Sequence, residues 1–472
     1  MCKKEKTMSK VINLDALRRK ANPNFVAVKP HKRKFAFDYL PPMTASLQNL
    51  APVRHPSQTT QLLAKVGAAL PSSYNWANKA DVATKRMGAS AANASKVAAI
   101  LKPLNQLGCG SCWAFSTAST LADRYTLFNG LSTSLNLSPT YLLSCDTDGN
   151  EGCNGGFPAL AGKFFETSGL PTMECQDYTW CPTTEKPNNE DIPACSEIKN
   201  SCYQDQDDGT VSPTTSISNF YKAVGGSTQA LPTPDALKAE IWHNGPVTAT
   251  FAVYSDFIGR ERDVTNKQGW VNTSNIYVNL TDPSDTSDTS DTTHGLYAGY
   301  SPTVMMGGHA VVITGWGLEP NPQGLPADIT SKLKTMFGGL PFWVVRNSWG
   351  TQWNGDGFFK FAQSVPELNI NMTTRLDRSV NQDGSVVGGG TTFLPVTNQP
   401  TPKIFTSPPL GGERRGNLGD ASTGGTSGSD STNFWTQPGG IATIAAISVV
   451  AVAIIVVGCV VGLKHKKKRG VA

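Results

Sequence analysis

The sequence predicts an α+β fold that is followed by one transmembrane helix. Apolar residues recur at helical spacing from Ala114 to Phe128, and Gly130 then favours the end of that helix. A second helix is expected from Pro234 to Asn244. Strands are expected in the later half of the folded region, at 247–254, 309–316, 342–346 and 357–361. A helical segment therefore precedes a strand-rich one.

Composition divides the 472 residues into more than one unit. The expected parts are a basic segment at 1–69, a folded region at 70–376, a stalk rich in Gly, Ser, Thr and Pro at 377–440, a membrane span at 441–463 and a basic tail at 464–472. The first part is either a disordered basic tail or a short inhibitory prosegment. The net charge of +5 comes from both ends. No nucleic-acid motif accompanies these basic ends, and no nucleic-acid partner is expected.

The most informative side chain is Cys112, which follows a Gly-Cys-Gly-Ser turn and begins the first predicted helix. A thiol at a helix N-terminus faces unpaired N–H groups and the positive end of the helix dipole. Both favour the thiolate, which is the nucleophilic form. The alternative is an inert buried cysteine, but the flanking glycines and Gln106 favour a reactive one.

A cysteine nucleophile requires a base, a group that orients the base, and donors for the oxyanion. His309 begins an apolar strand after two glycines, which leave space beside it. Asn347 lies in Arg-Asn-Ser-Trp-Gly and can accept a hydrogen bond from an imidazole N–H. Either residue alone would have an ordinary structural explanation. Together with Cys112 they fit nucleophilic catalysis.

These motifs resemble the papain family of cysteine proteases, whose signature includes Cys-Gly-Ser-Cys-Trp. Segments around Asn244-Gly-Pro-Val, Met305-Met-Gly-Gly-His309 and Gly355-Asp-Gly-Phe are similar to the cathepsin B-like branch, over roughly 70–375. The resemblance implies a two-lobed fold with a cleft between the lobes. A helical lobe would carry the nucleophile, and a β-barrel-like lobe would carry the histidine and asparagine.

The resemblance also implies the role of each motif residue. Cys112 is expected to be the nucleophile, and His309 the base that pairs with it as imidazolium. Asn347 would orient His309. Gln106 would donate to the oxyanion together with the backbone N–H of Cys112. No metal or other cofactor is expected.

Substrate contacts are implied for three further positions. Gly155 and Gly156 would offer their backbone to a bound peptide strand. Trp349 would cover the histidine–asparagine hydrogen bond and exclude water from it. The expected partners are protein or peptide substrates, and the protein is expected to be a monomer.

The chain has ten cysteines, eight of them between Cys109 and Cys202, which indicates a disulfide framework in an oxidising compartment. If Cys112 stays reduced, an odd number remains in this region. The resemblance implies the pairs Cys109–Cys153, Cys175–Cys202 and Cys181–Cys195. Cys145 would then be the odd thiol, and a Cys145–Cys181 bond is the alternative.

In cathepsin B-like enzymes, the corresponding loop carries two adjacent histidines that bind a substrate's C-terminal carboxylate. Here residues 182–194 contain no histidine and three acidic residues. Endopeptidase activity without dipeptidyl-carboxypeptidase activity is therefore expected. The alternative function is a catalytically silent, membrane-displayed binding protein on the same fold.

The expected topology has the catalytic region in a lumen or outside the cell and the basic tail in the cytoplasm. Five basic residues follow the span, and the positive-inside rule places them in the cytoplasm. Cysteine density agrees, as do the sequons at Asn93, Asn136, Asn272, Asn279 and Asn371. No apolar segment of a secretory signal follows the basic N-terminus, and this disagrees with a lumenal or extracellular location. A different N-terminus, unconventional export or a tail-anchored cytosolic protease are the alternatives.

Overall fold

In a computed structural model of the protein, the described residues are 51–66, 69–86, 100–131, 133–181, 187, 189–205, 211–254, 257, 276–280, 295–297, 301–303, 305–371, 374, 376–377 and 389–397. They all belong to one compact unit of the chain. Among them, no helix is long and apolar enough to cross a membrane. The predicted span at 441–463, the basic tail and most of the predicted stalk lie outside the described residues.

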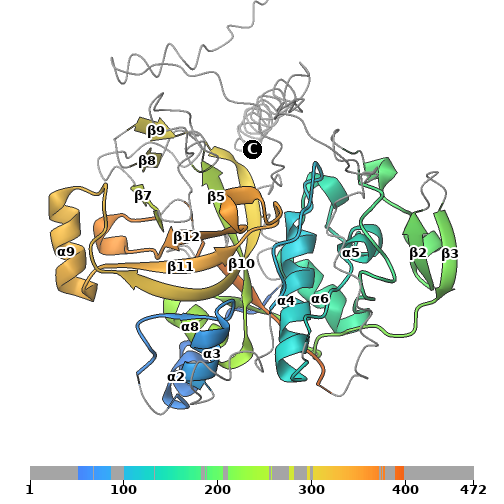
Figure 1. Ribbon diagram of the computed structural model, residues 1–472, viewed down its shortest axis with the longest axis horizontal. Helices are drawn as coiled ribbons and strands as arrows, with labels where there is room; N and C mark the ends of the chain where they lie inside the picture. Colours follow the sequence, from blue (N-terminus) through green and yellow to red (C-terminus); the bar gives the residue numbers. More distant parts are fainter. Residues whose placement is uncertain are drawn as a thin grey trace, which may run out of the picture. The chain divides into compact units, whose positions relative to one another are not determined.

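The helical part is built around α4 (Cys112–Phe128), which is buried from Cys112 to Thr126. A helix that is buried on all sides lies in the middle of a core. Its predicted start and end are confirmed, since Gly130 follows it in a left-handed conformation with φ of 59°. The elements around it are α5 (Pro139–Cys145), α6 (Pro158–Thr167), α7 (Cys195–Ile198), η2 (Gly152–Asn154), η3 (Asn189–Asp191) and the hairpin of β2 (Ser201–Asp205) and β3 (Val211–Ser216) (Figure 1).

The strand-rich part is one antiparallel sheet with a parallel strand at its edge. Its order is β4 (Gln229–Leu231), β13 (Gly389–Thr392), β5 (Val247–Tyr254), β10 (Met305–Glu319), β11 (Leu340–Arg346), β12 (Phe358–Ala362) and β6 (Ile276–Tyr277), with β1 (Tyr74–Asn75) also paired to β10 (Figure 1). The four predicted strands are confirmed, and β10 extends beyond its predicted bounds at both ends.

Shorter elements surround this sheet. They are α2 (Pro56–Ala64), α3 (Lys79–Arg86), α8 (Pro234–Asn244), α9 (Ala327–Phe337), η4 (Trp353–Gly355), η5 (Pro366–Leu368) and a small sheet of β7 (Asn279–Leu280), β8 (Gly295–Tyr297) and β9 (Ser301–Thr303). Helix α8 has its predicted bounds, because the Thr233 hydroxyl caps its N-terminus and Gly245 follows its end.

The structure extends the folded region beyond both of its predicted edges. At the C-terminal edge, β13 lies between β4 and β5 although it falls within the predicted stalk. Phe393, which follows β13, is fully buried against Phe165 with ring centroids 5.1 Å apart. A Gly-Gly-Thr-Thr strand has little apolar content, so composition does not reveal it. Its neighbours in the sheet supply the apolar contacts.

At the N-terminal edge, residues 51–66 are folded onto the domain. The backbone of Arg54 donates to Ala230 of β4, and its guanidinium forms an ion pair with buried Glu240 at 2.7 Å. Helix α2 contacts α8, where His243 bonds the carbonyl of Leu62. The compact unit therefore begins before Leu70.

The cysteine framework differs from the expected one at one bond. The structure contains Cys109–Cys153 and Cys175–Cys202, but the prediction of a Cys181–Cys195 bond is wrong. Cys195 is bonded instead to Cys145, with their Cα atoms 4.9 Å apart. Cys145 ends α5 and Cys195 begins α7, and contact between these helices brings the two side chains together. The alternative Cys145–Cys181 bond is excluded as well.

Three of the five sequons have buried asparagines. Asn279 and Asn371 are completely buried and Asn136 is 5% exposed. The Asn371 amide nitrogen, which would carry a glycan, donates to the carbonyl of Ala362. An attached glycan is incompatible with this packing, so these three positions do not support the lumenal topology. Asn93 and Asn272 lie outside the described residues.

Candidate active site

The Cys112 thiol lies beside strand β10. Cys112 is the first residue of α4 and is fully buried, and its Sγ accepts the backbone N–H of Ala310 at 3.0 Å. Ala310 directly follows His309 in β10. The fold thus brings the predicted nucleophile next to the predicted base, 197 residues later in the chain.

His309 is held in place by a hydrogen bond and by ring packing. Its Nε2 lies 2.7 Å from Asn347 Oδ1. That same oxygen accepts the backbone N–H of Ser348 at 2.8 Å, which identifies it as the amide oxygen. Nε2 therefore donates, and the lone pair of the neutral imidazole lies on Nδ1, where it can accept a proton.

Trp349 stacks on the imidazole of His309, with ring centroids 4.8 Å apart and an interplanar angle of 24°. Phe251 meets the same ring edge-on at 5.8 Å. Burial lowers the pKa of His309 to about 4, although the hydrogen bond with Asn347 acts in the opposite direction. The ring is consequently neutral over most of the pH range, which is the form that a general base requires.

Gln106 is completely buried and is fixed by Ser348 and by its own turn. Its backbone N–H donates to Ser348 O at 2.8 Å, and its Oε1 accepts from the Ser348 hydroxyl. Its Nε2 donates to Cys109 O at 3.0 Å, within the turn that leads to Cys112. Ser348 thus connects Gln106 to Asn347. In the sequence, the only signal for this connecting role of Ser348 is its position between Asn347 and Trp349.

Gly156, one of the two predicted glycines, lies against Trp113, the residue that follows Cys112. A side chain at Gly156 would come within 2.6 Å of Trp113 and of Asn150 Oδ1, so only glycine fits there. Asn150 also accepts the backbone N–H of Phe157, and its amide donates to Asp146. Burial raises the pKa of Asp146 to about 7, although the hydrogen bond from Asn150 lowers it. The Gly155–Gly156 backbone is therefore positioned beside the N-terminus of α4.

The predicted site residues are thereby gathered from separate parts of the sequence. Cys112 and Gln106 come from the helical part, and His309, Asn347 and Trp349 from β10 and the segment after β11. In the part of the chain that the structure describes, no three His, Cys, Asp or Glu side chains form a group that could hold a metal. The arrangement provides a thiol and a neutral imidazole, and the amide of Asn347 fixes the tautomer of that imidazole.

The amino-acid sequence is similar to those of known cysteine proteinases. A gut-specific cysteine proteinase of Caenorhabditis elegans is 31% identical over 276 residues, covering 56% of this chain and 65% of that protein. Cathepsin B-like cysteine proteinase 5 of the same organism is 28% identical over 284 residues, covering 56% and 66%. The chain thus spans just under two thirds of the length of these relatives.

Among solved structures, proCathepsin B S9 from Trypanosoma congolense is 24% identical, with a TM-score of 0.44, and the match covers 76% of this chain and 87% of that one. The family model of papain family cysteine proteases matches residues 89–281 and 261–376, which is more than half of the chain. The chain therefore belongs to the papain family of cysteine proteases.

Proposed function

We propose that the protein is a membrane-anchored thiol endopeptidase that hydrolyses peptide bonds through Cys112, His309, Asn347 and Gln106. One observation carries the proposal: the thiol of Cys112 lies against the backbone of Ala310, while the neighbouring His309 is bonded to Asn347 at 2.7 Å. Nucleophile, base and orienting group thus stand in the order that covalent catalysis requires.

In the proposed reaction, the Cys112 proton passes to His309 Nδ1, and the thiolate attacks the carbonyl carbon of the peptide bond. The oxyanion that forms accepts hydrogen bonds from Gln106 Nε2 and from the backbone N–H of Cys112. His309 then gives its proton to the departing amine, and a thioester remains on Cys112. Water, deprotonated by His309, hydrolyses this thioester and restores the thiol.

The experiment that tests this proposal is covalent labelling of the catalytic domain by an epoxysuccinyl thiol-protease probe. We expect one label per molecule, at Cys112, and none in Cys112→Ala. Burial raises the pKa of the thiol of Cys181, the other described cysteine outside a disulfide, to about 11, so this thiol is protonated over the pH range of the test. Cys181 should therefore stay unlabelled. Absence of labelling at every pH from about 4 to 8 would favour the silent binding protein.

The proposed specificity is endopeptidase action without release of C-terminal dipeptides. Residues 182–194 contain no histidine to bind a terminal carboxylate, and the Cys181–Cys195 bond that would close this loop is absent. We expect an internal bond of a long peptide to be cut at equal rates whether its C-terminus is free or amidated. Preferential release of dipeptides from the free form would contradict the proposal.

The proposed membrane anchor is residues 441–463, which carry no charge and are followed by five basic residues. By the positive-inside rule, the catalytic domain faces a lumen or the cell exterior. Protease protection on sealed membranes, with an epitope at each end of the chain, tests this topology. Protection of the catalytic domain together with digestion of the tail is the expected pattern in vesicles whose cytoplasmic face is outside. Digestion of the catalytic domain together with protection of the tail would indicate a tail-anchored cytosolic protease.

A further inference from the structure

Tyr178 connects the disulfide-closed loop from Cys175 to Cys202 with the segment that leads to the nucleophile. The tyrosine is completely buried. Its hydroxyl donates to the backbone carbonyl of Gln106 at 3.0 Å and lies 3.0 Å from the hydroxyl of Ser111. Gln106 and Ser111 stand at the two ends of the turn before Cys112. One phenol group therefore contacts both ends of that turn.

The ring of Tyr178 is itself held on two sides. Phe115 of α4 meets it edge-on with ring centroids 4.7 Å apart, and Trp180 does so at 5.1 Å. The indole of Trp180 is fixed in turn, because its Nε1 donates to the hydroxyl of Thr140 at 3.1 Å. A ring that is packed in this way cannot rotate to follow a displaced partner. The position of its hydroxyl is thus set by the helical core.

Gln106 is consequently fixed from two directions. Its N–H is bonded to Ser348, which follows β11, while its carbonyl is bonded to Tyr178 in the helical part. The carbonyl is buried, so the loss of this partner leaves a polar group without compensation. The backbone of Gln106 is then expected to shift, and its side-chain amide shifts with it.

We propose that Tyr178 is a positioning residue for the oxyanion site, acting through Gln106 and Ser111. The inference rests on the proposed function, in which the side chain of Gln106 and the N–H of Cys112 stabilise the oxyanion. These two donors belong to the ends of the turn that Tyr178 contacts. Donors to an oxyanion act only when they are preorganised at the position that the charge will occupy, so a small displacement lowers the rate.

The test is Tyr178→Phe, which keeps the ring and removes the contacts of the hydroxyl with Gln106 and Ser111. We expect kcat for peptide hydrolysis to fall about tenfold with KM unchanged, because the hydroxyl acts on the transition state and not on substrate binding. Alkylation of Cys112 by iodoacetamide displaces iodide and forms no oxyanion. Its rate should therefore stay within about twofold of wild type.

The matched control is Tyr125→Phe. Tyr125 is likewise buried in the helical part, and its hydroxyl donates to the carbonyl of Lys222 at 2.6 Å. The same hydroxyl accepts the backbone N–H of Lys222 at 3.0 Å, so this variant also loses two contacts of a tyrosine hydroxyl, away from the turn, and its kcat should match wild type. An unchanged kcat in Tyr178→Phe, or equal losses in both variants, would overturn the inference.

Two further outcomes separate the inference from the function on which it rests. Parallel losses of hydrolysis and of alkylation in Tyr178→Phe would mean that the variant disturbs the thiol itself, which overturns the positioning role. If wild-type protein is alkylated at Cys112 but hydrolyses no peptide, the proposed function fails. The positioning role then fails with it, because no oxyanion forms.

Discussion

Replacement of His309 by alanine is expected to lower kcat/KM for peptide hydrolysis by about 10²–10⁴-fold, the usual contribution of a positioned acid–base group. The imidazole is fixed by Asn347 at 2.7 Å and by stacking on Trp349, so no other group can take its place. Steady-state kinetics on a peptide substrate measures the effect. The control is His243→Ala on α8, which bonds the carbonyl of Leu62 and lies outside the proposed site.

The same residue predicts a pH dependence. Burial lowers the pKa of His309 to about 4, so the ring is neutral above that value and protonated below it. Activity should therefore fall as the pH decreases through about 4. Because the thiol and the imidazole titrate as a coupled pair, the observed value belongs to Cys112 and His309 together. A profile that is flat between about pH 3 and 6 would contradict the assignment of His309 as base.

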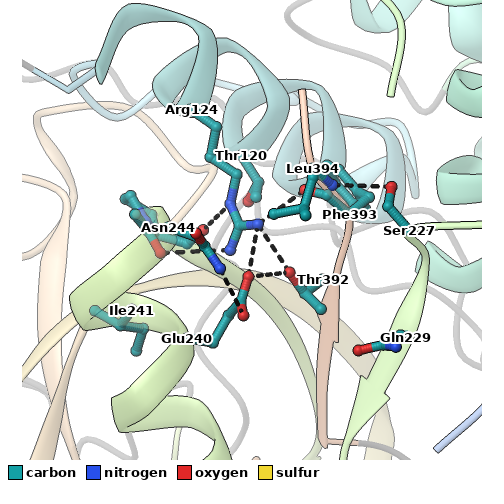
Figure 2. Close-up of polar contacts among 12 residues, drawn as sticks. Thr120, Arg124, Ser227, Gln229, Glu240, Ile241, Asn244, Thr392, Phe393 and Leu394 are labelled. Atoms are coloured by element: carbon teal, nitrogen blue, oxygen red, sulfur yellow. Dashed lines mark hydrogen bonds and ion pairs between the residues drawn. The ribbon is translucent and has the colours of Figure 1, made fainter. Parts of the chain in front are cut away.

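The largest expected effect on stability is that of Arg124→Met. Figure 2 shows the guanidinium of Arg124 facing the Glu240 carboxylate and Thr392, beside the strand that leads to Phe393. Arg124 and Glu240 are completely buried and form an ion pair at 2.9 Å. Glu240 keeps Arg54 as a cationic partner at 2.7 Å, so its buried charge becomes only partly compensated, and the loss should reach at most about 3–5 kcal/mol. Denaturant unfolding of the catalytic domain should show this decrease.

The matched control is Lys332→Met, which removes one partner of an exposed pair with Asp328 on α9. Exposed pairs contribute about 0–1 kcal/mol, and the variant should unfold nearly as wild type does. Equal stabilities of the two variants would show that the buried network contributes little.

Glu240 also makes the contribution of this network to folding stability depend on pH in the acidic range. Burial opposes ionisation of the carboxyl group, but attraction by Arg124 and Arg54 outweighs it and lowers the pKa from 4.5 to about 2. A lowered carboxyl pKa stabilises the folded state fully above the unfolded value of 4.5. That contribution is lost as the pH falls toward about 2. In Arg124→Met the pKa of Glu240 rises, so this part of the pH dependence should shrink.

Much of the proposed site could be predicted from the sequence because each of its residues lies in a short motif that can be read from neighbouring residues. Cys112 has its turn and its helix, His309 its glycines and its strand, and Asn347 the Asn-Ser-Trp motif. The helical period and the strand alternation then placed each motif on the right kind of element. Ser348 and Tyr178 were missed because their roles depend on contacts with residues far away in the chain.

The pairing of the cysteines depends even more clearly on contacts between residues that are far apart in the chain. Sequence parity predicted that a thiol other than Cys112 stays reduced among the eight between Cys109 and Cys202, and in the structure that thiol is Cys181. Which cysteine this is depends on the contact between α5 and α7, which puts Cys145 opposite Cys195. Disulfide pairing is a matter of distance and direction between side chains, and neither is a property of local sequence.

The sequence by itself determined the family, the proposed nucleophile and the elements that carry the proposed site. Only the tertiary structure decided the edges of the folded unit and the burial of three sequons. Strand β13 has little apolar content of its own and is ordered by pairing with β4 and β5. Residues 51–66 are held by the ion pair of Arg54 with Glu240 and by contact between α2 and α8. Local patterns determine which structures a segment can form. The partners that stabilise a weakly apolar segment come from elsewhere in the chain.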